Sequence, residues 1–151
     1  MRIFLVAAIA FTFHVANAAA ADNGMVTIKS AHGVKETVDR MESALKEKGV
    51  TVVARVDHAE AAAKNGLALR PTTVLIFGNP KAGTPMMQCA QTMAIDLPQK
   101  ALVWEDDKGE VWLAYNDQLY LARRHGATSC DQALAANAGA LAGFAKVATE
   151  R

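Results

Sequence analysis

Short segments in which polar and hydrophobic residues alternate, or in which apolar residues run together, recur along this chain and predict β-strands. The earliest, at residues 25–30, alternates with a period of two, as a half-buried strand does. The segment at residues 72–77 is mostly apolar and follows Pro71. Five strands are predicted, at residues 25–30, 50–56, 72–77, 100–105 and 111–115.

Two longer segments repeat their apolar residues every three or four positions and therefore predict amphipathic helices. The first covers residues 34–48, and Gly49 follows it as a helix-terminating residue. The second covers residues 130–149, with Ser129 as the expected N-cap and Gln132 completing a capping box. The apolar stripe of the first helix consists of Val34, Val38, Met41 and Leu45.

Shorter helices are predicted between the strands. One covers residues 58–65, where Asp57 and Glu60 form a capping-box pattern, and another covers residues 86–92. The polar segment 105–110 predicts a hairpin turn between the last two strands. The order of strand, helix, strand, small helix, three strands and helix indicates one α+β domain. We expect a mostly antiparallel sheet with the two long helices packed on one face.

Residues 79–84, with the sequence Asn-Pro-Lys-Ala-Gly-Thr, predict a loop, because Asn, Pro and Gly dominate turns. Glycines let backbone N–H groups converge on an anion, and Lys81 would add positive charge. The alternative is a rigid structural turn with a solvated Lys81. The binding hypothesis proposes a small anionic ligand where this loop meets two more distant residues, and its site consists of His58, Asn79, Lys81, Gly83, Thr84 and Asp96.

Three parts of the chain resemble the DUF302 domain family. They are Asp57-His58 followed by residues 69–72, the segment 77–86, and residues 95–98 leading into residues 101–106. The resemblance covers nearly all of residues 25–149. It implies a TBP-like β-α-β(4)-α sandwich, one domain and a homodimer. It implies no catalytic residue, because the family has no established mechanism.

The first 18 residues predict a secretory signal peptide. Arg2 precedes an apolar run at residues 3–13 that is too short to span a bilayer, and Ala16-Asn17-Ala18 is a small-x-small cleavage site. Cleavage as late as residue 21 fits the pattern too, and residues 19–24 are expected to be flexible. A periplasmic or secreted protein follows from this prediction. An N-terminal membrane anchor is the alternative.

Charge and motifs exclude several classes of function. Once Arg2 is removed, the chain has 15 basic and 15 acidic residues, and no basic stripe favours nucleic acid or an anionic membrane surface. No later segment predicts a membrane span. Nucleophile-elbow and closely spaced histidine motifs are absent from the sequence. We therefore expect a non-enzymatic, stress-associated module that binds a small ligand or a partner.

Sulfur-containing residues support a second hypothesis, a periplasmic redox or metal-handling protein. Met86, Cys89 and Met93 would share one helix face, and such soft ligands suit copper or a non-covalent haem. Core packing is the alternative for these side chains, and the sequence requires no cofactor. In an oxidising compartment Cys89 and Cys130 either form a disulfide or remain two separate thiols.

Overall fold

The computed structural model of the protein describes residues 23–151. The predicted signal peptide and most of the predicted flexible start lie outside the described residues. The strands are β1 (Met25–Lys29), β2 (Thr51–Asp57), β3 (Thr72–Gly78), β4 (Gln99–Glu105) and β5 (Val111–Asn116). The helices are α1 (Val34–Glu47), α2 (His58–Lys64), α3 (Pro80–Cys89), the 3-10 helix η1 (Gln91–Ile95), α4 (Gln118–His125) and α5 (Asp131–Thr149).

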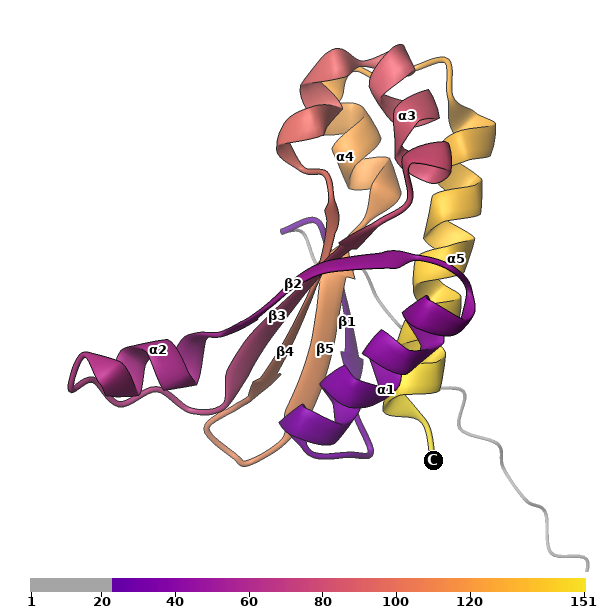
Figure 1. Ribbon diagram of the computed structural model, residues 1–151. Helices are drawn as coiled ribbons and strands as arrows, with labels where there is room; N and C mark the ends of the chain where they lie inside the picture. Colours follow the sequence, from indigo (N-terminus) through magenta and orange to yellow (C-terminus); the bar gives the residue numbers. More distant parts are fainter. Residues whose placement is uncertain (1–22) are drawn as a thin grey trace, which may run out of the picture.

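The five strands form one antiparallel sheet in the order β1-β5-β4-β3-β2. The two long helices, α1 and α5, pack against each other and against one face of this sheet (Figure 1). The predicted α+β architecture is therefore confirmed, with all five strands at the expected positions.

The main hydrophobic core, which we call the sheet core, lies between the sheet and helices α1 and α5. Val38, Met41 and Leu45 of the predicted helical stripe are completely buried there, against Leu75 and Leu113 of the sheet. The period of the stripe matches the face that the helix buries. The sheet core is thus the part of the fold that the apolar pattern predicts most directly.

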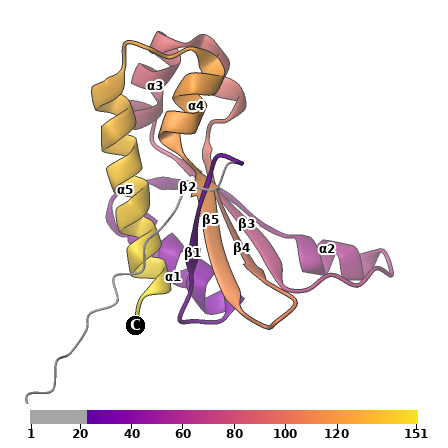
Figure 2. The same ribbon diagram turned by 180° about the vertical axis from the view of Figure 1, so that it is seen from behind.

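The second face of the sheet is covered by no helix of the described chain (Figure 2). The strand register places Val56, Val74, Leu102 and Ala114 in one row across this face. Trp104 lies opposite Trp112 in a neighbouring row. The uncovered face is therefore largely apolar, and we call it the open face.

At one end of the sheet, α3, η1, α4 and the first turns of α5 form a separate layer that we call the upper lobe (Figure 1). Its own hydrophobic cluster includes Met86, Met93, Leu121, Cys130 and Leu134. Helix α2 projects from the other end of the sheet, capped by Asp57, whose side chain accepts a hydrogen bond from the Glu60 N–H over 2.9 Å as predicted.

Three local predictions are wrong. Residues 80–85 are the first turns of α3 rather than a loop, and the helix predicted at residues 86–92 ends at Cys89. Asn79 caps α3 and Pro80 occupies its first position, where a missing N–H costs no helical hydrogen bond. At α5 the N-cap is Cys130 instead of Ser129, and no side-chain cap hydrogen bond forms in the described chain.

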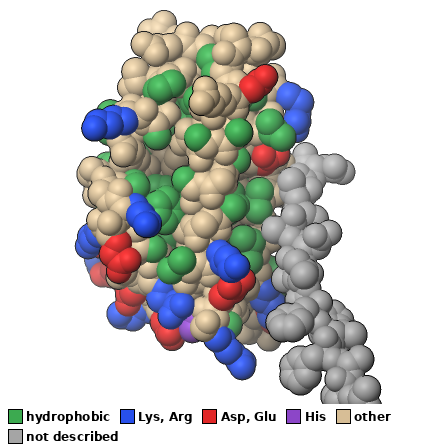
Figure 3. Space-filling model, turned by 90° about the vertical axis from the view of Figure 1, so that its right-hand side faces the viewer, with side chains coloured by type: hydrophobic (Ala, Val, Ile, Leu, Met, Phe, Trp, Pro, Cys, Tyr) green, Lys and Arg blue, Asp and Glu red, His purple; other side chains and the backbone are tan. Residues whose placement is uncertain are grey.

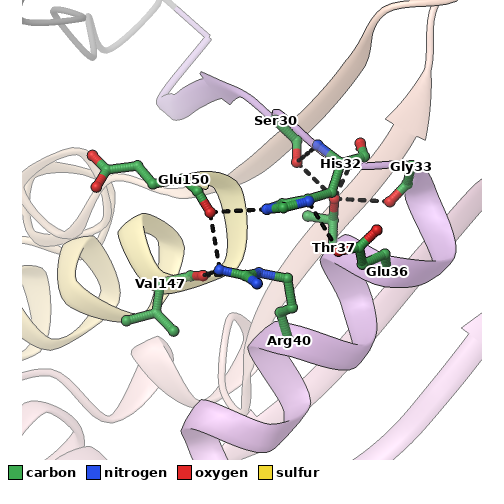
Figure 4. A network of polar contacts seen from close by, with 8 residues as sticks. All are labelled: Ser30, His32, Gly33, Glu36, Thr37, Arg40, Val147 and Glu150. Atoms are coloured by element: carbon green, nitrogen blue, oxygen red, sulfur yellow. Dashed lines mark hydrogen bonds and ion pairs between the residues drawn. The ribbon is translucent and has the colours of Figure 1, made fainter.

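Helix α5 is tied to α1 at its C-terminal end (Figure 4). The Arg40 guanidinium donates to the carbonyl oxygens of Val147 and Glu150, each at 2.9 Å from Nη2. His32 Nε2 lies 2.8 Å from the Glu150 carbonyl oxygen, and His32 Nδ1 lies 2.9 Å from the Glu36 carboxylate. These contacts satisfy carbonyls that the end of a helix leaves unpaired. None of the helices in residues 23–151 is long and apolar enough to cross a bilayer.

Candidate functional site

The start of α3 does not form the predicted anion site. The Asn79 side-chain oxygen accepts from the Lys81 N–H over 2.9 Å, and the Asn79 carbonyl accepts from the N–H groups of Ala82 and Gly83, each over 2.9 Å. Pro80 has no N–H to offer. Because helix formation uses these donors, none of them converges on an anion, and the predicted nest of backbone amides is wrong.

A cleft of about 400 Å³ lies beside the same segment, between α3, η1 and the start of β2. Its volume is within the range of about 300–1,000 Å³ that small-molecule sites occupy. Within the described chain, the side chains that line it include none that carries a charge. Its lining is Thr51, Val53, Gly78, Asn79, Pro80, Ala82, Gly83, Thr84, Met86, Met87, Ala94, Leu97, Pro98, Gln99 and Asn137.

A β-bulge brings Val53 to the mouth of the cleft. The register between β2 and β3 shifts between Val52 and Ala54, so Val53 is the extra residue of the edge strand. Bulges re-aim side chains at the edges of sheets. The Val53 side chain is 59% exposed although it is apolar, and it contributes to the cleft lining.

The polar side chains of the cleft are three amides from different elements and the hydroxyls of Thr51 and Thr84. Asn79 precedes α3, Gln99 begins β4 and Asn137 lies in α5. Gln99 is buried, and its Nε2 donates to the Gln118 side-chain oxygen over 3.1 Å. Asn137 Nδ2 donates to the carbonyls of Ala133 at 2.9 Å and Ala82 at 3.3 Å, which joins α5 to α3. The polar side chains that line the cleft are therefore all uncharged.

A second hollow of about 610 Å³ adjoins the cleft between α1, α5 and the end of β3. Gly78, Asn79, Ala82, Gln99 and Asn137 line both hollows, so the two meet along these residues. On the face of the molecule seen in Figure 3, charged side chains gather mostly in the lower half, whereas hydrophobic and uncharged ones dominate above.

The structure brings together only some of the six residues predicted for the ligand site. Asn79, Gly83 and Thr84 line the cleft. Lys81 is exposed and lines a third hollow of about 490 Å³ against α5, which shares Asn79, Ala82 and Asn137 with the cleft. His58 lies beyond the far end of β2, whose seven residues span roughly 20 Å. The predicted meeting of His58 with the start of α3 is therefore wrong.

Asp96, the sixth predicted residue, belongs to a polar cluster that the sequence did not reveal. Its Oδ2 lies 2.6 Å from His125 Nε2, and its Oδ1 lies 3.3 Å from Arg124 Nη1. His125 Nδ1 lies 3.0 Å from the Thr92 hydroxyl. These contacts join η1 to the end of α4. The described residues that line the cleft do not include these four.

The predicted sulfur ligands lie in the upper lobe. Met86 and Met93 are completely buried among aliphatic side chains, as the core-packing alternative expects. Cys89 is half-buried, 3.6 Å from the Ser129 hydroxyl. Both cysteines are free thiols. Within residues 23–151, no group of three or more His, Cys, Asp or Glu side chains is arranged to hold a metal ion.

The two thiols nevertheless interact. Burial raises the pKa of the Cys130 thiol to about 11, and a hydrogen bond with Cys89 and the nearby charge of Asp131 act in the same direction. A thiol with a raised pKa is a poor nucleophile at neutral pH, because little thiolate is present. This environment resembles that of a structural cysteine more than that of a peroxidatic one.

Comparisons with known proteins identify relatives of this chain. The model of the family described as "Domain of unknown function DUF302" matches residues 26–143. Among solved structures, the crystal structure of an uncharacterized conserved DUF302 protein from Bacillus stearothermophilus superimposes with a TM-score of 0.74. It is 21% identical to this chain, and the match covers 83% of this chain and 98% of that protein.

Curated proteins from Brucella are more similar in sequence. Fluoride-specific ion channel FluC 1 of Brucella suis is 49% identical over 104 residues, which is 69% of this chain and 41% of that protein. The protein of the same name from Brucella abortus is equally identical over 38% of its length. This chain therefore spans about two-fifths of the length of the curated relatives that it matches.

Proposed function

This chain belongs to the DUF302 family, and we propose that it is a non-enzymatic binding module whose uncharged cleft beside α3 takes a small, largely apolar ligand. The observation that carries the proposal is the chemistry of the cleft lining. Apolar side chains such as Val53, Met87 and Leu97 surround a few amides, and this combination is typical of small-molecule sites. A charged ligand would find no opposite charge among these described side chains.

Met87 also suits this role, because an unbranched thioether side chain adapts to ligands of different shape. Part of the sequence-based hypothesis is thereby kept and part is replaced. Asn79, Gly83 and Thr84 remain in the site, whereas Lys81, and with it the preference for an anion, is left out.

The neutral fluorescent probe N-phenyl-1-naphthylamine tests this proposal. We expect saturable binding by the wild-type protein and a loss of affinity of about tenfold in Ala94→Trp, which places a large ring in the cleft. Ala63→Trp on the exposed side of α2 is the matched control and should bind like the wild type. Equal binding by the two variants, or no binding by the wild type, would overturn the proposal.

The place of action that we propose is the periplasm or the cell exterior. The apolar run near the N-terminus supports export. The Brucella relatives support a location close to a membrane. In those relatives, the stretch similar to this chain is part of a longer protein that is named an ion channel. Fractionation of cells expressing the full chain, with mass measurement of the mature protein, tests export. An uncleaved cytoplasmic protein would contradict it.

We also propose that two copies pair through the open face. A row of apolar side chains on an uncovered sheet, including Val74 and Leu102, is a surface that a second copy would remove from water. Leu102→Lys should convert the dimer to a monomer in light scattering. Val147→Lys, a charge placed on the exposed part of α5, is the control that should leave the dimer intact. A monomeric wild-type protein would sink this part of the proposal.

Redox or metal handling through the upper lobe is the alternative function. The adjacent thiols of Cys89 and Cys130 support a redox role better than they support a metal site, because Met86 and Met93 are enclosed by the lobe. Native mass spectrometry of protein purified from the exported fraction discriminates the two functions. Bound copper or haem that is lost in Cys89→Ser would favour metal handling over the uncharged ligand.

A further inference from the structure

The two asparagines at the junction of the cleft with its neighbouring hollow have amide orientations that the hydrogen bonds fix. Asn79 must present its oxygen to the Lys81 N–H, because only an acceptor caps the helix there. Asn137 must present its nitrogen to the carbonyls of Ala133 and Ala82, because a carbonyl oxygen only accepts. Neither amide can turn around without losing these bonds.

In these orientations the Asn79 Nδ2 donor and the Asn137 Oδ1 acceptor point away from the bonds just described. Among the hydrogen bonds between side chains of residues 23–151, none engages Asn79 Nδ2 or Asn137 Oδ1. Neither atom is buried without a partner, so both are accessible to solvent or a ligand. A ligand that satisfied both would need one acceptor and one donor, and a peptide group supplies a carbonyl oxygen and an N–H.

Apolar surface lies on both sides of these two amides. On one side the cleft presents Val53, Met87 and Leu97. On the other side the adjoining hollow presents Val50, Phe144 and Val147. Charged side chains, Glu47 and Lys48, contribute to the adjoining hollow. The two hollows together therefore form a groove. Its two ends, which we call the two limbs, are largely apolar, and the uncharged amides of Asn79 and Asn137 lie between them.

We propose that this groove binds an extended, apolar segment of polypeptide, with backbone C=O and N–H groups of the segment held by Asn79 Nδ2 and Asn137 Oδ1 and the flanking side chains in the two limbs. The inference rests on the proposed function, because it assigns a ligand class to the same cleft. A plain hydrocarbon ligand would leave both amide groups unpaired on binding, which is costly when they are desolvated. A peptide satisfies them.

The similarity to longer chains points in the same direction. In the Brucella relatives a stretch like this one is joined to further polypeptide that makes up more than half of each protein. A peptide segment from an associated protein is thus a partner that a domain of this kind meets at high local concentration. The bound segment would lie in the groove rather than extend the sheet, because the bulge at Val53 interrupts the edge strand.

The test uses a capped tripeptide, acetyl-Leu-Val-Leu-amide, in calorimetric titrations of the full mature chain. Its ester analogue, in which one central N–H is replaced by oxygen, has the same shape but lacks the donor. Asn79→Asp keeps an acceptor for the helix cap but removes the free N–H donor, and Asn137→Leu removes the free acceptor. Asn65→Asp, on the exposed end of α2, is the control for the added charge.

We expect the tripeptide to bind the wild type and Asn65→Asp equally. In Asn79→Asp and Asn137→Leu its affinity should fall about tenfold more than that of N-phenyl-1-naphthylamine, and the ester analogue should bind about tenfold more weakly than the amide. Thermal melting should show both variants folded. If the tripeptide and the probe lose affinity equally in these two variants, the proposal that the asparagines bind the peptide backbone is overturned.

Other outcomes separate this inference from the proposed function. If the wild type binds the naphthylamine probe but not the tripeptide, the peptide assignment fails while the apolar cleft stands. If the neutral detergent dodecyl maltoside displaces the probe and the tripeptide does not, the ligand is a lipid-like amphiphile and the inference is overturned. If neither probe nor peptide binds, both proposals fail together.

Discussion

The sheet core and the upper lobe both bury branched aliphatic side chains, but methionine makes up a larger share of the buried residues in the upper lobe. The sheet core buries branched aliphatic and aromatic residues such as Leu75, Phe77 and Val103, whose conformations are restricted. The upper lobe encloses Met86 and Met93, which have more rotatable bonds and tolerate changes of shape. The cleft lies at the border between them. A rigid platform thus supports one wall of the cleft, and an adaptable layer supplies the other.

The largest effect should come from the rigid side. Leu75→Ala in β3 removes a side chain that is only 1% exposed and leaves a cavity against α1. We expect the free energy of unfolding to fall by about 2–5 kcal/mol. Denaturant unfolding followed by circular dichroism measures this change. A loss below about 1 kcal/mol would mean that the sheet core collapses readily, contrary to the comparison.

Oxidation should have the next largest effect, and it acts on the upper lobe. In oxidised glutathione, Cys89 and Cys130 would together lose two protons and two electrons to the glutathione disulfide and form an S–S bond. We expect the wild type to gain about 2–4 kcal/mol of stability over Cys89→Ser in oxidising buffer and to lose that advantage in reducing buffer. Unfolding curves in the two buffers measure the difference.

Mass measurement checks the chemistry behind this prediction. The intact oxidised chain should be two mass units lighter than the reduced chain, a direct consequence of losing two hydrogen atoms. Two free thiols after oxidation, or equal stability of Cys89→Ser and wild type in both buffers, would leave the pair as separate thiols. The alternative that the sequence left open would then be the correct one.

If the upper lobe is adaptable, a substitution that changes the shape of a buried side chain there should lower the free energy of unfolding by less. Met93→Leu keeps nearly the same volume at a fully buried position, and we expect a cost below about 1.5 kcal/mol. Thermal unfolding followed by fluorescence gives the value. A cost as large as that of Leu75→Ala would show that the lobe is packed as strictly as the sheet core, and the contrast between the two regions would disappear.

The smallest effect on global stability should come from α2, which belongs to neither region. Asp57→Ala removes its N-cap, and loss of a cap costs a helix about 0.5–2 kcal/mol. Because α2 buries none of its described residues, that local cost should barely change global unfolding. Hydrogen exchange should speed up across residues 58–64 while the melting temperature stays nearly constant. A lowered melting temperature would reveal that α2 packs against something in solution.

Sequence patterns predicted the sheet core well, because its residues follow simple periods. The stripe of α1 and the strand at residues 72–77 depend on alternation and helical repeat, and burial on one face produces such patterns directly. Asp57 with Glu60 was equally readable, since the capping geometry is local and needs only residues within one turn. In each case the signal and the structure lie in the same short segment.

The cleft was predicted only in part, because the Pro- and Gly-rich segment beside it was interpreted as a loop. Pro80, Gly83 and Pro85 are residues that dominate turns, yet here the Asn79 cap and a proline at the first position begin a helix. Context from tertiary packing decides such segments. Asn137 and Val53 were missed because their partners are distant in sequence. A polar residue within the apolar pattern of α5 was the available signal for Asn137, and it was not used.

The bulge at Val53 affects whether strands of other chains can pair with the edge of the sheet. Strand β2 forms one border of the sheet, and a straight border presents a row of unpaired backbone groups on which foreign strands can assemble. An extra residue in that row breaks its spacing, and Arg55 and Asp57 add charge nearby. Irregularity at this border therefore disfavours edge-to-edge pairing with foreign strands, even though the same irregularity exposes an apolar side chain.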